Sequence, residues 1–314
     1  MPALPCNPVQ DGGRPPALRL AAMIPKLEGY LYLALAMATV GSTVVVAKLI
    51  AAGLPPFTAT ALRLGLALPC FVLLMIRARA ALPRPDARDA LILLVQAIAG
   101  SVAYTTLLIA GLTLTSAANA GVIVGTLPVV SAGIAILLLG ERPRPALLGA
   151  IALAAGGVLA ITLRPGAMDA RSLAGNTLVL AAVMCEGLFI LLNKRLRRTI
   201  APLAQSTLMT GLGLAVAIVP AAVEQPWINA IDATVIWAIV YYALVPTVGG
   251  YLLWYAGAAR VSGAEAALFT AVAPVTAVLL AFVLLGEALG AGQILGIGLV
   301  LIAVAGTARA GTGS

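Results

Sequence analysis

One carboxyl group lies where a membrane would make it costly. Glu186 falls in the second half of an apolar stretch, residues 174–193, which is long enough to cross a bilayer. An ionisable side chain near mid-membrane costs about 3 kcal/mol or more, and Glu is too short to reach the surface. Such a group must be protonated, face water or pair with a cation. Glu186 is therefore a candidate for proton binding or cation recognition, with a neutral, hydrogen-bonded structural Glu as the alternative.

Aromatic and amide side chains mark a second candidate wall. Tyr251 and Trp254 are three residues apart in the apolar stretch 233–257 and share one helical face. Tyr242 lies deeper in the same stretch, and Gln96 and Tyr104 lie in the stretch 90–112. The deeper residues need hydrogen-bond partners, which favours a cavity, whereas an interfacial aromatic belt is the alternative for Trp254. The other candidate substrate-binding residues are Ser42, Asn119 and Phe269.

Prolines and glycines predict the flexible points of these segments. Pro128 and Pro274 lie in the middle of expected helices, where each removes an internal hydrogen bond. The freed carbonyls are tolerated only in a protein-lined or wet site. Gly249 and Gly250 soften the segment that also contains Tyr251. We expect these four residues to shape gates around a central site.

Helix ends explain most of the remaining polar residues. Ser116 fits an N-cap, and Glu141 and Glu287 fit capping of helix termini and orientation of the following turn. Lys48 is expected to snorkel from the last turn of its segment to the surface. For Arg63, two turns inside the stretch 57–76, outward snorkelling and an inward role both stay open.

Composition places the chain in a bilayer. With 62% hydrophobic and 10% charged residues and a mean hydropathy of +1.09, it has too little polar surface for a water-soluble globule. There is no His, and the three Cys have no paired spacing, so no metal site, disulfide framework or catalytic residue is predicted. We expect no cofactor, no nucleic-acid partner and no enzymatic activity.

Ten apolar segments of about 20 residues predict an all-α integral membrane protein with ten transmembrane helices. The first 27 residues are expected to be a disordered cytoplasmic tail. The segments are 29–50, 57–76, 90–112, 116–139, 145–163, 174–193, 203–222, 233–257, 262–285 and 291–308.

The chain is a tandem duplication. Residues 28–141 align with residues 174–287 at a constant shift of 146, which superposes Gly41 on Gly187 and Pro128 on Pro274. The two units, 28–165 and 174–308, hold five segments each. Because five is odd, the units cross the membrane in opposite senses and form an inverted repeat, as in many transporters.

Charge orients the chain. With both termini in the cytoplasm, fifteen of the 19 Lys and Arg residues fall on the inner side and three on the outer side. This bias predicts a multi-pass protein of the inner membrane with cytoplasmic N- and C-termini.

These features resemble a known family. Gly41-Ser42 with Lys48 in the first segment, Pro55-Pro56 before the second, and Leu-Gly-Glu at 139–141 and 285–287 are similar to the drug/metabolite transporter superfamily and its EamA-type exporters. The aromatic-rich stretch 233–257 makes the chain most similar to the family's aromatic amino acid exporters.

The resemblance implies a secondary transporter that exports amino acids, or similar small amphipathic metabolites, by alternating access. Sugar-phosphate, nucleotide or drug export is the alternative within the superfamily, and a membrane-embedded enzyme or a non-transporting receptor is the alternative outside it. The implied partners are a small-molecule substrate and the lipid bilayer, and two repeats in one chain favour a monomer. Proton antiport and facilitated diffusion stay open, with Glu186 as the candidate for proton coupling.

Overall fold

A computed structural model describes residues 16–139, 170–193, 195–197, 200–224, 231–258, 260, 269 and 272–312, with isolated positions between 145 and 157. Within these residues the chain is helical and has no strand, as expected for backbone that must satisfy its own hydrogen bonds in lipid. The expected segment 145–163 and Glu141 lie outside the continuous described ranges.

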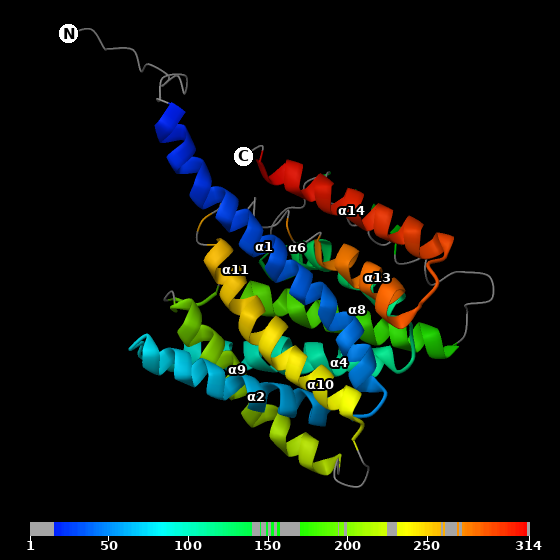
Figure 1. The fold of residues 1–314 in the computed structure, drawn as a ribbon, viewed down its shortest axis with the longest axis horizontal. Coiled ribbons are helices and arrows are strands. Elements are labelled where there is room, and N and C mark those ends of the chain that lie inside the picture. Colours follow the sequence, from blue (N-terminus) through cyan, green and yellow to red (C-terminus); the bar gives the residue numbers. More distant parts are fainter. Residues whose placement is uncertain are drawn as a thin grey trace.

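The first half of the bundle follows the expected order (Figure 1). α1 begins at Pro16, inside the segment expected to be a tail. α3, the π-helical segment η1 and α4 form one continuous rod. The elements are α1 (Pro16–Ala51), α2 (Pro56–Arg77), α3 (Ala87–Gln96), η1 (Ala97–Ala103), α4 (Tyr104–Leu112), α5 (Ala117–Val124) and α6 (Leu127–Leu139).

The second half repeats this pattern. The start of α1 and the end of α14 lie at the same end of the bundle, called the termini end below (Figure 1). The elements are α8 (Ala170–Asn193), α9 (Pro202–Val223), α10 (Ala233–Tyr242), η3 (Ala243–Gly249), α11 (Gly250–Ala258), α13 (Val272–Leu285) and α14 (Ala291–Thr312).

Six helical stretches are long and apolar enough to cross a membrane: Leu27–Ala51, Pro56–Arg77, Ala87–Leu112, Ala170–Phe189, Pro202–Val223 and Ala233–Trp254. The expected segment 116–139 is split into α5 and α6, and only the latter part of segment 262–285 forms a continuous described helix, α13. The described residues therefore support a multi-span helical protein without giving the number ten.

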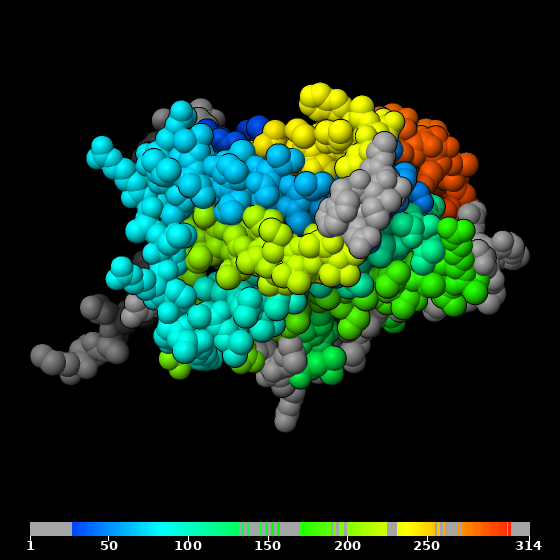
Figure 2. Space-filling model, turned by 90° about the horizontal axis from the view of Figure 1, so that it is seen from below, coloured from blue at the N-terminus to red at the C-terminus, as the bar shows by residue number. Residues whose placement is uncertain are grey.

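Helix packing follows the duplication. α2 packs on α9, its own equivalent in the second unit, and the two lie side by side on the face seen in Figure 2. α1 packs on α11 and α13, while the equivalent α8 packs on α4 and α6. A Cβ added to Gly111 would lie 2.9 Å from the carbonyl oxygen of Gly175, and one added to the equivalent Gly257 would lie 3.0 Å from that of Gly29. The repeat thus extends to individual close helix crossings.

The two π-helical segments are also equivalent. η1 and η3 are seven residues long, and a shift of 146 superposes one on the other. π-helical turns leave the regular ladder of backbone hydrogen bonds and are frequent at functional sites. Pro246 lies inside η3, and Gly249 ends it.

Candidate functional site

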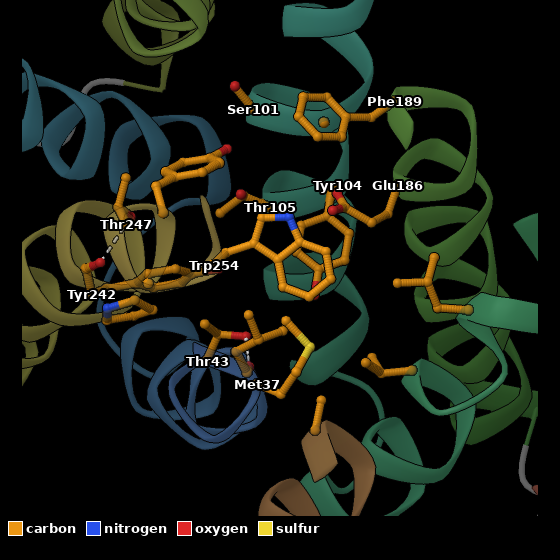
Figure 3. A pocket seen from close by; sticks show the side chains of 18 of the residues that line it. Met37, Thr43, Ser101, Tyr104, Thr105, Glu186, Phe189, Tyr242, Thr247 and Trp254 are labelled. Atoms are coloured by element: carbon orange, nitrogen blue, oxygen red, sulfur yellow. Dashed lines mark hydrogen bonds between the residues drawn. The ribbon is translucent and has the colours of Figure 1, made fainter. Parts of the chain in front are cut away.

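A cavity of about 220 Å³ lies between the two units, at the level of η1 and η3. Figure 3 shows side chains from several helices converging on it, with the Trp254 indole near its centre. Sixteen of the twenty described residues that line it form eight pairs related by the shift of 146. The pairs are Met37 and Val183, Val40 and Glu186, Thr43 and Phe189, Gly100 and Pro246, Ser101 and Thr247, Tyr104 and Gly250, Thr105 and Tyr251, and Leu127 and Ala273. The cavity is therefore centred on the axis that relates the two units.

Glu186 extends from α8 toward Tyr104 and the Trp254 indole (Figure 3). No described residue hydrogen-bonds to its carboxylate, and Arg63 is the cation that influences it electrostatically. The carboxylate thus meets cavity space rather than a fixed partner. Its repeat equivalent is Val40, which lines the same cavity and cannot ionise.

Arg63 is the one cation among the described residues that line this cavity. Its side chain is only 7% exposed. Nη1 donates to Thr247 Oγ1 at 3.0 Å, and Nη2 donates to the Ser101 carbonyl at 2.9 Å and to Thr105 Oγ1 at 3.0 Å. The guanidinium carbon lies 4.9 Å from the centre of the Tyr242 ring, which gives a cation–π contact. Arg63 therefore points inward, which resolves the alternative that the sequence left open.

Five of the nine predicted substrate-binding residues line the cavity: Tyr104, Glu186, Tyr242, Tyr251 and Trp254. Phe189, which sequence reasoning missed, completes the aromatic lining. Its signal was available, because it follows Glu186 by three residues and so shares its helical face. A Cβ on Gly100 would collide with the Phe189 ring, so the absence of a side chain at Gly100 makes room for that ring.

The other four predicted residues lie elsewhere. Ser42 Oγ donates to the Thr39 carbonyl at 2.6 Å and lies 2.9 Å from the Tyr241 hydroxyl. Gln96 is fully buried and donates through Nε2 to the Phe189 carbonyl at 3.1 Å. In the remaining two cases, Asn119 Oδ1 accepts from Gln293 Nε2 at 2.9 Å, and Phe269 stacks on Tyr30 with ring centres 5.4 Å apart.

The four predicted gating residues have different local settings. Pro128 is the second residue of α6, after the chain leaves α5 at Gly125. It therefore starts a helix instead of kinking one, because the first helical positions need no backbone N–H partner. Pro274 is the third residue of α13. Gly249 and Gly250 lie where η3 meets α11, and Gly250 lines the cavity.

Charged residues hold helix ends together at the end opposite the termini. The Glu287 carboxylate accepts from the N–H groups of Ala117 and Ala118 at 2.9 and 2.8 Å, so it caps α5 of the other unit. Lys48 does not snorkel. Its Nζ donates to the carbonyls of Leu112 and Thr115 at 2.6 and 2.7 Å, because the last turn of α4 leaves carbonyl groups without helical partners.

A packed core fills this end of the molecule. It takes in Val44 and Ile50 of α1, Leu112 of α4, Ile123 of α5 and Val179 of α8, all essentially unexposed. The cavity residues of α1, from Met37 to Thr43, precede this core along the helix. The cavity is therefore bounded by packed side chains on the side away from the termini.

Comparison with known proteins agrees with this architecture. Residues 27–163 and 173–309 each match the EamA-like transporter family. The uncharacterized transporter YetK of Bacillus subtilis is 34% identical over 281 residues, covering 88% of this chain and 85% of that protein. A probable terminal-alkyne amino-acid exporter of Streptantibioticus cattleyicolor is 31% identical over 206 residues, covering 65% of this chain and 68% of that protein. A solved crystal structure with 21% identity shares the fold, with a TM-score of 0.60 over 90% of this chain and 97% of its own.

Proposed function

Since the chain belongs to the EamA-like transporter family, we propose that it exports amino acids, including aromatic ones, across the inner membrane by alternating access. The observation that carries this proposal is the cavity on the repeat axis. In an inverted repeat the two units can exchange conformations, which opens the same central site to each face in turn.

The size and chemistry of the cavity support a small amphipathic substrate. Sites for drug-sized ligands occupy about 300–1,000 Å³, whereas this cavity measures about 220 Å³. Its described lining includes one cation, Arg63, and one carboxyl group, Glu186, between aromatic walls. A multiply charged phosphate ester would call for a surplus of cations, but a zwitterion with an apolar side chain matches both signs and the aromatic lining. The amino-acid exporter among the relatives supports the same class.

The packed end of the bundle indicates which side of the cavity is closed. If the termini lie in the cytoplasm, as the charge bias predicts, the packed core lies on the periplasmic side of the cavity. This arrangement corresponds to the state in which an exporter loads its substrate from the cytoplasm.

Glu186 is the group that we propose to couple transport to protons. Glu186 lies within a membrane-spanning helix, where a charged carboxylate is costly, and it lines the central cavity. A carboxyl group in this position can bind a proton from one face and release it to the other. Facilitated diffusion through the same cavity is the competing mechanism.

The test is flux of radiolabelled amino acids into and out of proteoliposomes that contain the purified protein. Saturable flux of at least one amino acid, absent from empty liposomes, is the expected result. Flux of sugar phosphates or drugs without any amino acid would refute the substrate class. Glu186→Gln keeps the shape of the side chain but cannot titrate, so we expect this variant to lose the difference in flux between about pH 6 and about pH 8 that the wild type shows. An unchanged pH profile would favour facilitated diffusion.

A further inference from the structure

We infer that Arg63 is the subsite for the carboxylate group of the substrate, and that a free carboxylate is therefore required of every substrate that this cavity binds. The inference rests on the proposed function and goes further, because it gives a chemical requirement and assigns it to one residue.

The first argument is the incomplete hydrogen bonding of Arg63. A guanidinium has five N–H donors, and the three bonds of Arg63 leave two without a partner in the described part of the chain. One of them is Nε, which is buried and has no hydrogen-bond acceptor. A buried donor without an acceptor is rare and destabilising unless another molecule supplies the acceptor.

The second argument is charge. The three acceptors of Arg63 are neutral oxygens, of Thr247, Ser101 and Thr105, and no carboxylate of a described residue forms an ion pair with it within 4.0 Å. A desolvated cation favours an anion as its partner, and guanidinium groups bind carboxylates with good geometry. Glu186 lines the same cavity as Arg63 and forms no ion pair with it within 4.0 Å. A molecule that carries both charges could therefore find a partner for each of them in this one cavity.

The third argument is position. Ser101 and Thr247 are equivalent residues of the two units, and Arg63 bonds to both. Its guanidinium therefore lies close to the repeat axis, between η1 and η3. A group on this axis keeps equivalent surroundings when the units exchange conformations, so it can hold one end of the substrate in both states. The residue of the second unit that is equivalent to Arg63 is Met209, so only the first unit carries a positive charge at this position.

These observations also give the orientation of the substrate. The carboxylate binds at Arg63, the ammonium group approaches Glu186, and the side chain lies against Trp254 and Tyr251. Molecules that lack the carboxylate leave Arg63 unpaired inside the cavity, and should be rejected even when their side chain fits.

The experiment compares four related probes on the purified, full-length protein: L-phenylalanine, L-phenylalaninamide, phenethylamine and 3-phenylpropionate. Binding is measured by competition against whichever radiolabelled amino acid gives flux, and L-leucine with L-leucinamide or L-alanine with L-alaninamide replaces the set if phenylalanine does not bind. We expect the amide and the amine to bind at least about 30-fold more weakly than the amino acid, because truncating one partner of a buried charge pair has effects of this size or larger. The carboxylate without an ammonium group should keep part of the affinity.

Variants separate recognition from structure. Arg63→Gln should lose the discrimination between acid and amide, while Arg63→Lys should keep part of it. Arg260→Gln, which changes an exposed Arg, should leave the discrimination unchanged. Equal binding of phenylalanine and its amide by the wild type would overturn the inference without any variant, and would leave export as such intact. Absence of flux for every amino acid would refute the proposed function, and the same acid–amide comparison by thermal shift would still test the subsite.

Discussion

Glu287 offers the most direct test of how the two units are joined. It follows the end of α13 and accepts from two backbone N–H groups at the start of α5, in the other unit. Ala117 and Ala118 are buried, so these N–H groups have little access to water if the carboxylate is removed. We predict that Glu287→Ala destabilises the folded protein without changing the shape of the cavity.

The magnitude follows from two contributions. A hydrogen bond to a charged group contributes about 1.5–3 kcal/mol, and a negative charge near a helix N-terminus adds about 0.3–1 kcal/mol. Because Glu287 is only partly buried, water replaces part of the lost hydrogen bonding in the variant. We therefore expect the free energy of unfolding to fall by about 2–4 kcal/mol. At about 2–4 °C per kcal/mol, the slope for chains of about 150–250 residues, the Tm should fall by roughly 4–16 °C.

The assay is thermal unfolding of the detergent-solubilised protein, followed by intrinsic fluorescence. Glu287→Gln should fall between wild type and Glu287→Ala, because it keeps one acceptor oxygen but loses the charge. Glu28→Ala is the matched control, since Glu28 is exposed and faces Arg260 at 3.7 Å, a pair that should contribute about 0–1 kcal/mol. If Glu287→Ala unfolds at the same temperature as Glu28→Ala, the carboxylate does not hold the two units together.

Three further outcomes are expected. Trp254→Ala should weaken amino-acid export at normal expression, because the indole lies in the cavity, whereas Trp237→Ala, which changes a side chain 70% exposed, should leave flux unchanged. The hydrogen bond from the Asp89 N–H, followed by the charge of Arg197, lowers the pKa of Asp86 below 3.8. Its stabilising effect should thus be complete above about pH 3.8 and be lost as the pH falls through the lowered value, and acid unfolding of Asp86→Asn should lack this step. A reporter fused after Arg309 should be active only as a cytoplasmic reporter, and periplasmic activity would contradict the charge-based topology.

The duplication made much of the architecture predictable from sequence. The constant shift of 146 residues predicts which helices are equivalent, and most residues that line the cavity pair with one another at the same spacing. The N-cap at Ser116 is confirmed, since its Oγ accepts from the Asn119 N–H at 3.1 Å. Such features depend on residue spacing along one chain, which sequence records directly.

Side-chain direction was less predictable. Whether Arg63 snorkels or points inward depends on how α2 rotates about its axis, which packing against α9 decides. The helical spacing of Ser42 and Gln96 is the same whether their helix face lines a cavity or packs on another helix. In the structure Ser42 contacts the Tyr241 hydroxyl and Gln96 donates to the Phe189 carbonyl. η1 and η3 were not foreseen either, because glycine and proline signal a break in a helix without specifying a π-helical turn.

The two units have kept their backbone and diverged in the side chains that face the cavity. Equivalent positions hold Glu186 and Val40, Phe189 and Thr43, or Tyr251 and Thr105, so the second unit supplies the carboxyl group and most of the aromatic lining, while the first unit supplies Tyr104. Motion that exchanges two conformations needs similar packing in both units, which the paired helix contacts provide. Recognition of an asymmetric molecule needs different side chains on the two units, because two identical cavity walls would bind it in two orientations. The conserved packing and the divergent lining therefore serve different steps of one transport cycle, and the axis itself is the place where a single charged group, Arg63, can serve both states.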